Sequence, residues 1–472
     1  MTRFSMTSLI PLVAALVVAG CASDSRFVPQ AAPAAPAAFK EEGAARFADV
    51  APAEGQARGA WWRAFSDPVL DDLVARASAG NTGLQAAAAR VAEARALLRD
   101  ADAGLLPQVG ARAGVQRATI QPGFGAAPGQ AANLGQAGLS ASWEPDFFGK
   151  LRQARDAASL DVRSREAALQ SMRLVVQSEV AQAYFGLREL DAERLLVRET
   201  VAAYRDTLRL TERRYAAGDV AELDLARVRS EVAATDSQAL ALDRERALHE
   251  HALAVLLGEV PSGFSLPEAD WAGALPIVPA GLPSAALARR PDVAAAQLAM
   301  QAAEQRAGVA RRAWFPDVAL TADGGVASTD LGDLFKWSAR AWGIGALLSL
   351  PVFDGGRREA GVRNAEAQWD LAAASYRDQV LGAFRDVEDQ LASLRLLSDQ
   401  ARAQAQAVDA AARATALSDV RYRNGLVSQL ELLDARRTEL ANRRIAVQVR
   451  GAQYGATIGL VRALGGGWSA VS

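Results

Sequence analysis

Residues 150–217 read KLRQARDAASLDVRSREAALQSMRLVVQSEVAQAYFGLRELDAERLLVRETVAAYRDTLRLTERRYAA, a run of 68 residues without a proline. Its apolar side chains recur at steps of three, four and seven residues, as at Val197, Val201, Tyr204 and Leu208. This spacing is typical of a coiled-coil seam. A continuous helix of this length would span roughly 100 Å, about three times the width of a small domain. The run therefore predicts a tall wall and not the interior of a globule.

A second run of 68 residues without a proline occupies 357–424, and both runs belong to a repeat of the whole chain. The motif RYAAG at 214–218 recurs 207 residues later as RYRNG at 421–425. Two further pairs keep this order at nearly the same spacing: LLPQV at 105–109 with WFPDV at 314–318, and EPDFFG at 144–149 with LPVFDG at 350–355. The sequence thus indicates a duplicated module of roughly 200 residues, far longer than a solenoid repeat.

Each module has the same predicted order of elements. A helix over 81–105, or over 291–314, ends just before a proline, as helices tend to. A Gly-rich stretch and the long run follow, and beyond a glycine comes another helix, over 219–257 or 426–464. The two shorter helices, roughly 38 and 58 Å long, together match the long one. We therefore expect one continuous helix beside two stacked shorter ones, twice over.

Four stretches that alternate apolar and polar residues lie between these helices, at 107–120, 134–146, 316–328 and 338–353. In the second stretch, for example, one face would carry Ala137, Leu139, Ala141 and Trp143. Alternation over about ten residues is typical of membrane β-strands with lipid on one side. Any one such stretch taken alone would suit an ordinary surface hairpin better, but the pattern recurs at equivalent places in both modules.

Four strands are too few for a closed barrel, for which about eight is the smallest number. An open edge is not tolerated in lipid. Several copies of the chain must therefore share one barrel, and two copies would give eight strands whereas three would give twelve. The residues alone do not choose between these numbers.

The N-terminus has the layout of an export signal, with Arg3 followed by an apolar run from Leu9 to Val18. The segment LVVAGC at 16–21 resembles a bacterial lipobox, and Cys21 is the only cysteine of the chain. We therefore expect Cys21 to be acylated and to become the mature N-terminus. An ordinary signal peptide with a stray cysteine is the alternative.

The residues after the cysteine bear on the destination of the protein. Ala22 and Ser23 stand where lipoproteins kept at the inner membrane often have Asp, which favours release to the outer membrane. Several acyl chains give stable anchoring to lipid, whereas one is marginal. Residues 22–60 are rich in Ala and Pro, and we expect them to form an extended tether between lipid and body.

Composition excludes several classes of protein. A net charge of −2 offers no basic face for nucleic acid. The two histidines, His249 and His251, would point to nearly opposite sides of a helix and so could not share a metal ion. No phosphate-binding or dinucleotide-binding motif stands in a strand–helix context. We expect no catalytic residues, no cofactor and no metal, and hence no enzyme.

Motifs in a specific order along nearly the whole chain resemble the outer membrane factor family of TolC/OprM-like channels, and most closely its NodT-type lipoproteins. They are Trp61-Trp62 with Phe65, Asp67-Pro68 and Leu70; Asn81, Leu84, Ala89-Arg90 and Ala94-Arg95; Leu106-Pro107; Phe147-Phe148-Gly149-Lys150; Arg214-Tyr215 and Gly218; Arg289-Arg290-Pro291-Asp292-Val293; Phe315-Pro316; and Arg421-Tyr422 with Gly425.

This resemblance implies a mainly α protein with membrane β-structure. A homotrimer would form an α-barrel of long coiled-coil helices, continuous with a shared twelve-stranded β-barrel, from a duplicated module in each protomer. It would be the passive outer-membrane channel of a tripartite efflux pump that exports drugs or other small toxic molecules. Its partners would be a periplasmic adaptor protein, an inner-membrane RND-type pump and outer-membrane lipid.

The domain limits that we expect follow the repeat. They are a lipoprotein signal peptide over 1–20, a lipid anchor and tether over 21–60, a first repeat over 61–265, an equatorial segment over 266–288, a second repeat over 289–465 and a tail over 466–472.

In this family the tunnel closes at a periplasmic tip, where the helix-to-helix turns meet. The positions that match adaptor-docking turns are Arg214, Tyr215, Gly218, Arg421, Tyr422 and Gly425. Acidic rings narrow the tip, and the matching positions are Glu431 and Asp434, whose three copies would attract cations and repel anions. The alternative is a solvated helix face with pairs such as Asp434 and Arg437.

A pair that latches the tip shut in part of the family matches Asp224 and Tyr422. The basic latch residue expected two positions after Gly425 is Val427 here. Opening of the tip would therefore depend more on packing than on a complete latch.

Two other functions stay open at this point. One is a channel for type I protein secretion, since the sequence of a tunnel does not identify the molecules that pass through it. The other is a lipid-tethered periplasmic coiled-coil adaptor or scaffold, which would share the helices and the export signal but would not need the four alternating stretches.

Overall fold

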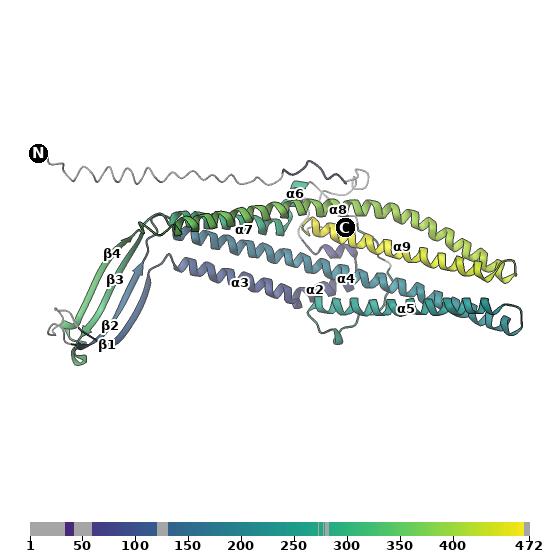
Figure 1. Cartoon of the computed structure of the whole chain (residues 1–472), viewed down its shortest axis with the longest axis horizontal. Helices are drawn as coiled ribbons and strands as arrows, with labels where there is room; N and C mark the ends of the chain where they lie inside the picture. Colours follow the sequence, from purple (N-terminus) through teal and green to yellow (C-terminus); the bar gives the residue numbers. More distant parts are fainter. Residues whose placement is uncertain are drawn as a thin grey trace.

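The computed structural model describes residues 34–41, 59–119, 131–271, 273–276, 278 and 283–466. The described part is elongated, with a sheet at one end and helix-to-helix turns at the other (Figure 1). Two helices dominate it, α4 (Lys150–Ala216) and α8 (Arg357–Arg423), of 67 residues each. Both confirm the predicted long helices to within one residue at either end.

The shorter helices lie along the long ones as expected. In the first module α3 (Thr82–Ala103) and α5 (Glu222–Leu257) pack on α4. In the second, α7 (Pro291–Arg312) and α9 (Gln429–Ala463) pack on α8. Figure 1 shows α3 and α7 between the sheet and the middle of the molecule, and α5 and α9 between the middle and the far end. Because α4 also contacts α7 and α9, the two modules form one wall.

Glycines in the left-handed region mark the ends of these helices. Gly149 (φ 75°) and Gly356 (φ 88°) stand directly before α4 and α8, and Gly218 and Gly425 follow their ends. Such φ angles carry little steric cost for glycine alone. The equivalent of Gly149 is therefore Gly356 and not Gly355 as the sequence motifs suggested, which makes the spacing 207 residues at both ends of the long helices.

A joint at mid-height connects the stacked helices in each module. In the first, the Asn81 side chain accepts from Leu84 N at the start of α3 and donates to Leu256 O near the end of α5, at 3.1 and 2.8 Å. In the second, Arg290 precedes α7 and donates to Ala463 O at the end of α9, at 3.1 Å. The same joint thus uses an amide in one module and a guanidinium in the other.

Two further helices belong to this middle region, α2 (Pro68–Gly80) and α6 (Pro283–Arg289). The predicted helix over 81–105 corresponds to α3, and the sequence analysis assigned no helix to the residues of α2. Asp67 caps α2 by accepting from Val69 N at 2.9 Å, and it also accepts a hydrogen bond from the Tyr184 hydroxyl at 2.6 Å. The short 3₁₀ segment Trp61–Phe65 precedes this cap.

The main hydrophobic core sits at mid-height, and it is richer in aromatic rings than a total of 6% aromatic residues would indicate. Ring centroids of Phe65 and Phe185 lie 4.9 Å apart, those of Phe185 and Tyr454 4.5 Å, and those of Trp271 and Tyr454 4.9 Å. A cluster of aromatic residues therefore lies where the two modules and their connecting segments meet.

Among the described residues, four strands form one antiparallel sheet in the order β1-β2-β3-β4. They are β1 (Gln108–Thr119), β2 (Ala131–Trp143), β3 (Asp317–Ser328) and β4 (Arg340–Ser349). The predicted strands are confirmed, although the last ends before Pro351. The pairing of β2 with β3 connects the two modules.

Candidate functional site

The sheet has one face composed almost wholly of apolar side chains. The registers Ala111↔Leu139, Leu139↔Gly324 and Gly324↔Trp342 align the predicted apolar positions of all four strands on this face. Its members include Val109, Ala111, Val115, Leu139, Trp143, Val318, Leu320, Val326, Trp342, Ile344 and Leu348. Trp342 and Ile344 are 80% and 82% exposed in the single chain. A surface of this kind requires an apolar environment.

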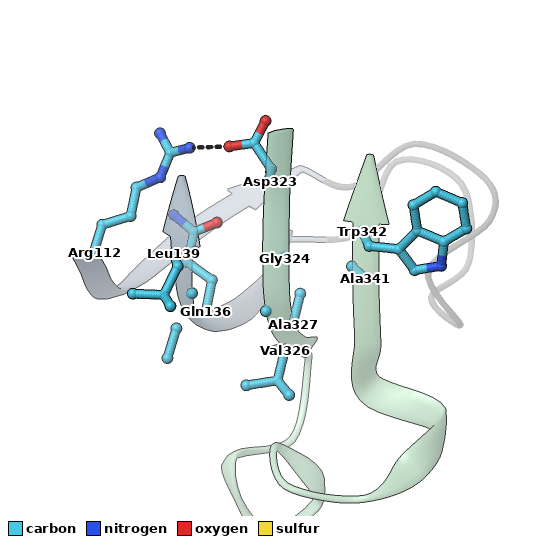
Figure 2. Close-up of a pocket in the computed structure, with 12 residues that line it drawn as sticks. Arg112, Gln136, Leu139, Asp323, Gly324, Val326, Ala327, Ala341 and Trp342 are labelled. Carbon is cyan, nitrogen blue, oxygen red and sulfur yellow. Dashed lines mark hydrogen bonds and ion pairs between the residues drawn. The ribbon is translucent and has the colours of Figure 1, made fainter. Parts of the chain in front are cut away.

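The opposite face is polar and rich in glycine. Arg112 of β1 forms an ion pair with Asp323 of β3 at 2.8 Å, and Figure 2 shows these side chains directed toward one another while Trp342 points away. Gly138 and Gly325 pair across β2 and β3, where the sheet is hollowed. A Cβ on Gly138 would lie 2.8 Å from Gly324 O, so the strands approach closely on this side. Glycine in a strand is typical of places where another backbone approaches closely.

Both edges of the sheet are without a neighbour. Strands β1 and β4 lie at the two ends of the strand order, and neither pairs with the other among the described residues. Edge strands expose unpaired N–H and C=O groups, which are ready to pair with another chain. In the part of the chain that the structure describes, no helix is both long enough and apolar enough to cross a membrane.

Exposed aromatic side chains flank the apolar face at both ends of the strands. Phe335 and Trp337, which are 86% and 78% exposed, lie in the connection from β3 to β4. Phe147 and Phe353, 69% and 91% exposed, follow β2 and β4 at the end that adjoins the helices. Aromatic girdles at the two membrane interfaces have this arrangement.

The far end of the molecule is made of two helix-to-helix turns. After α4, Gly218 N and Asp219 N donate to Tyr215 O and Arg214 O at 2.9 and 2.8 Å. After α8, the second turn repeats both bonds, from Gly425 N to Tyr422 O and from Leu426 N to Arg421 O, at 3.0 and 2.9 Å. Each turn is a Schellman motif that requires a glycine, which explains the RYxxG pattern of both modules.

The two tyrosines of this pattern occupy different environments. Tyr215 is 42% exposed, whereas Tyr422 is only 6% exposed and has the Arg214 guanidinium 5.4 Å from its ring centroid. The Tyr422 hydroxyl is buried and has no hydrogen-bond partner among the residues that the structure describes. The structure does not join it to Asp224, which forms an ion pair with Arg227 at 3.7 Å. The predicted latch is therefore not formed within one chain.

The two predicted tip acids are both exposed and differ in their partners. Glu431 lies in the first turn of α9, where its N–H donates to Ser428 Oγ at 3.4 Å, and it faces Arg421 at 3.7 Å. Asp434, one turn on, has no hydrogen bond or ion pair to any described residue. Arg437 does not pair with Asp434, because it donates to Glu231 of α5 at 2.8 Å. Asp434 is thus the freer of the two carboxylates.

Sequence reasoning missed a row of polar contacts between α4 and α9 near this tip. Gln429 donates to Thr211 Oγ1 at 2.8 Å, and Arg436 donates to Thr207 Oγ1 at 2.7 Å. Arg436 also donates to Asp419 of α8 at 3.1 Å. Thr211 lies seven residues after Tyr204 and therefore occupies a position of the coiled-coil seam. A polar residue at a seam position was the sequence signal that could have indicated these contacts. These contacts fix how the two helical hairpins lie against one another.

Farther from the tip, a half-buried carboxylate lies between the same helices. Glu189 of α4 lies against Gly451 of α9, and a side chain on Gly451 would collide with it. One turn on, Glu193 accepts from Arg444 and Gln448 at 3.0 and 2.7 Å. Burial, and then the negative charge of Glu193, raise the pKa of Glu189 to about 7. The fold therefore favours the protonated form of Glu189.

The variant Glu189→Gln should be more stable than the wild type at pH 8 and equal to it near pH 4. A raised pKa means that wild-type stability is fully present below about 4.5 and is lost as the pH rises toward 7. The shift corresponds to about 3 kcal/mol at most, which solvent reduces to about 1 to 2 kcal/mol. Urea midpoints of the helical circular dichroism signal at both pH values measure this. Glu199→Gln, on the exposed face of α4, is the control, and an equal change in both variants would contradict the assignment.

Some predicted features lie outside the described residues. Cys21 and the signal peptide belong to these, as do most of the tether and residues 467–472 of the tail. Among the described residues no group of three His, Cys, Asp or Glu side chains could hold a metal ion.

A family model described as outer membrane efflux protein matches residues 73–259 and 282–466. The chain is 35% identical over 415 residues to the pyoverdine export outer membrane protein OpmQ of Pseudomonas aeruginosa, with 86% of this chain and 87% of OpmQ covered. It is 31% identical over 471 residues to the cation efflux system protein CusC of Escherichia coli, with 98% and 99% covered.

Among solved structures, the fold is similar to that of the outer-membrane channel OprN. The TM-score is 0.85 at 29% sequence identity, and the similarity covers 95% of this chain and 99% of the OprN chain.

Proposed function

The chain belongs to the outer membrane efflux protein family, and we propose that it forms a passive conduit through which small toxic molecules pass from the periplasm to the exterior. It is an outer-membrane component of an efflux system. The observation that supports the conduit most strongly is the sheet, apolar on one face and polar on the other, at the end of helices roughly 100 Å long. Drugs are one expected class of cargo.

We infer that three copies assemble. The open edges of β1 and β4 support a barrel that several copies share, since lipid tolerates no open edge. The number three, and hence twelve strands, rests on the resemblance of the sequence to trimeric channels. The apolar face would meet the lipid, and the Arg112–Asp323 face would line the lumen. The aromatic side chains at both strand ends support this placement.

The proposal includes a lipid anchor and two protein partners. Acylated Cys21 would hold the N-terminus in outer-membrane lipid. The tip turns, with Arg214, Tyr215, Gly218, Arg421, Tyr422 and Gly425, would receive a periplasmic adaptor that connects the channel to an inner-membrane RND-type pump. The exposure of Tyr215 and of Leu426, at 42% and 69%, supports an apolar docking surface there. The domain limits over 1–20, 21–60, 61–265, 266–288, 289–465 and 466–472 belong to the same proposal.

We further propose that Glu431 and Asp434 form acidic rings at the tip, with Asp434 the stronger contributor because it forms no ion pair with any described residue, whereas Glu431 faces Arg421. For Asp224 and Tyr422, a latch would have to form between neighbouring protomers. The buried Tyr422 hydroxyl, which lacks a partner in the single chain, supports a contact of this kind.

The variant Glu431→Gln/Asp434→Asn should lower cation selectivity in planar bilayers. The substitutions keep the shape of the side chains and remove six carboxylates from a narrow mouth in the trimer, so the cation-to-anion permeability ratio should fall toward one. Single-channel reversal potentials in a salt gradient measure the ratio. The matched control, Glu359→Gln/Asp399→Asn, removes the same charge from the exposed side of α8. Unchanged selectivity in the tip variant would discard the acidic rings, and absence of conductance in the wild type would overturn the conduit.

A further inference from the structure

Part of the N-terminal segment is fixed on the helical body far from either end of the molecule. Within residues 34–41, Phe39 is only 4% exposed and belongs to the same buried cluster as Val387 and Leu391 of α8. An isolated aromatic residue in an Ala/Pro-rich stretch thus adds to the core at mid-height. The sequence predicts an extended tether between lipid and body over 22–60, and the structure adds that its residues 34–41 lie against the helical body.

The backbone beside Phe39 is bound by a single carboxylate. Lys40 N and Glu41 N donate to Glu388 Oε1 and Oε2, at 2.7 and 3.0 Å. Arg395, two turns farther along α8, donates to the Glu41 carboxylate at 2.7 Å. Hydrogen bonds with an ionised partner are stronger than neutral ones, and two from one carboxylate also fix orientation. Together with burial of the Phe39 ring, they form a seat on α8.

This seat divides the N-terminal segment into two parts of very different reach. Phe39 follows Cys21 by eighteen positions, so the two residues lie at most roughly 60 to 65 Å apart. Glu388 lies 31 residues beyond Arg357, the sheet end of α8, which is roughly 47 Å along the helix. Without the seat, the next buried residue in the described part of the chain is Trp61, 40 positions from Cys21 and within a reach of roughly 130 to 145 Å.

We propose that the seat of Phe39, Lys40 and Glu41 on α8 is a tether clamp, which sets how far the lipid anchor can stand from the body. The proposal rests on the proposed acylation of Cys21. With the clamp closed, the anchor reaches just past the sheet end of α8, where the apolar face begins. The clamp therefore holds the sheet at the height of the bilayer and limits axial movement of the body away from it.

A spin label at Ala38→Cys, an exposed position next to Phe39, tests the clamp in lipid vesicles. Acylated Cys21 is not available to the label, so one site is labelled. The label should be immobile in the parent protein and at least several-fold more mobile with Phe39→Ala. Lys40→Ala is the matched control, because that side chain is 86% exposed and only its backbone N–H binds Glu388. A label equally mobile in all three proteins would overturn the clamp.

Deleting residues 25–32 tests the reach. Phe39 then follows Cys21 by only ten positions, so the two residues lie at most roughly 36 Å apart, which is less than the distance from the seat to the sheet end of α8. The label should become mobile in the acylated deletion variant and stay immobile when the deletion is combined with Cys21→Ser. An immobile label in both would overturn the length-setting role. The mass of the N-terminal peptide reports acylation separately, so failure of the lipid anchor is distinguished from failure of the seat.

Discussion

Replacing Ile344 with arginine should abolish assembly in the outer membrane, whereas replacing the adjacent Gly343 with arginine should be tolerated. Ile344 lies on the apolar face near the middle of β4 and is 82% exposed in the single chain. A lipid-facing arginine at the midplane of a barrel costs about 2 to 4 kcal/mol, and an oligomer carries one per subunit. The amount of oligomer in outer-membrane fractions, resolved by electrophoresis without heating, measures the effect.

Gly343 is the matched control because it is the neighbour of Ile344 on β4, so an arginine introduced there lies at nearly the same height but on the opposite face of the sheet. It pairs with Asp323 on the polar face, and a Cβ at this position would meet no atom within 4 Å. An arginine there can extend into water beside a carboxylate. Equal loss of both variants would mean that the sheet has no lipid-facing side, and equal tolerance of both would contradict membrane insertion of this face.

Arg290→Met should be the most destabilising single substitution in the helical body. Its side chain is 8% exposed and donates to Asp292 at 2.7 Å, to Asp386 at 3.1 Å and to Ala463 O at 3.1 Å. Removing one partner of a buried ion pair leaves uncompensated charge and costs about 3 to 5 kcal/mol. The hydrogen bond from Arg290 holds the pKa of Asp292 below its usual range against the opposing effect of burial, so Asp292 is charged at neutral pH.

Urea midpoints of the helical signal at pH 7.5 measure this effect. Arg402→Met, on an exposed part of the same wall, should change the midpoint little, because surface ion pairs contribute about 0 to 1 kcal/mol. Adding Asp386→Asn to Arg290→Met should recover part of the loss, since the two residues interact directly. A loss no larger than that of Arg402→Met would contradict the role of Arg290 as the joint of the second module.

The long helices could be predicted from the sequence because their signals are local. The absence of proline over 150–217 and the seam from Val197 to Leu208 depend on neighbours a few residues apart, and helix geometry converts them directly into length. The strands could also be predicted, because the alternation of apolar and polar residues has a period of two within each strand. This pattern can be recognised without knowing which strand pairs with which. Even so, only the φ angles of the structure identified Gly356 as the residue directly before α8.

The joints and the clamp could not be predicted, because they depend on residues far apart in the chain. Asn81 and Arg290 each donate a hydrogen bond to a carbonyl near the end of the stacked helix in their module. Because one side chain is an amide and the other a guanidinium, a comparison of the two module sequences does not identify them as equivalent residues. Phe39 finds its partners about 350 residues away, on α8. At the tip, the sequence offered an ion pair between Asp434 and Arg437 as the alternative, but Arg437 donates its hydrogen bond to Glu231 on another helix. Contacts of this kind require the packed arrangement.

The most direct test of the account is the number of chains in the conducting species. The protein would be purified from outer membranes in mild detergent, measured by native mass spectrometry and reconstituted from the same fraction into planar bilayers. The account predicts three chains and single-channel conductance in that fraction, because three sheets of four strands close one barrel. A single chain without conductance would contradict it and would favour a lipid-tethered scaffold.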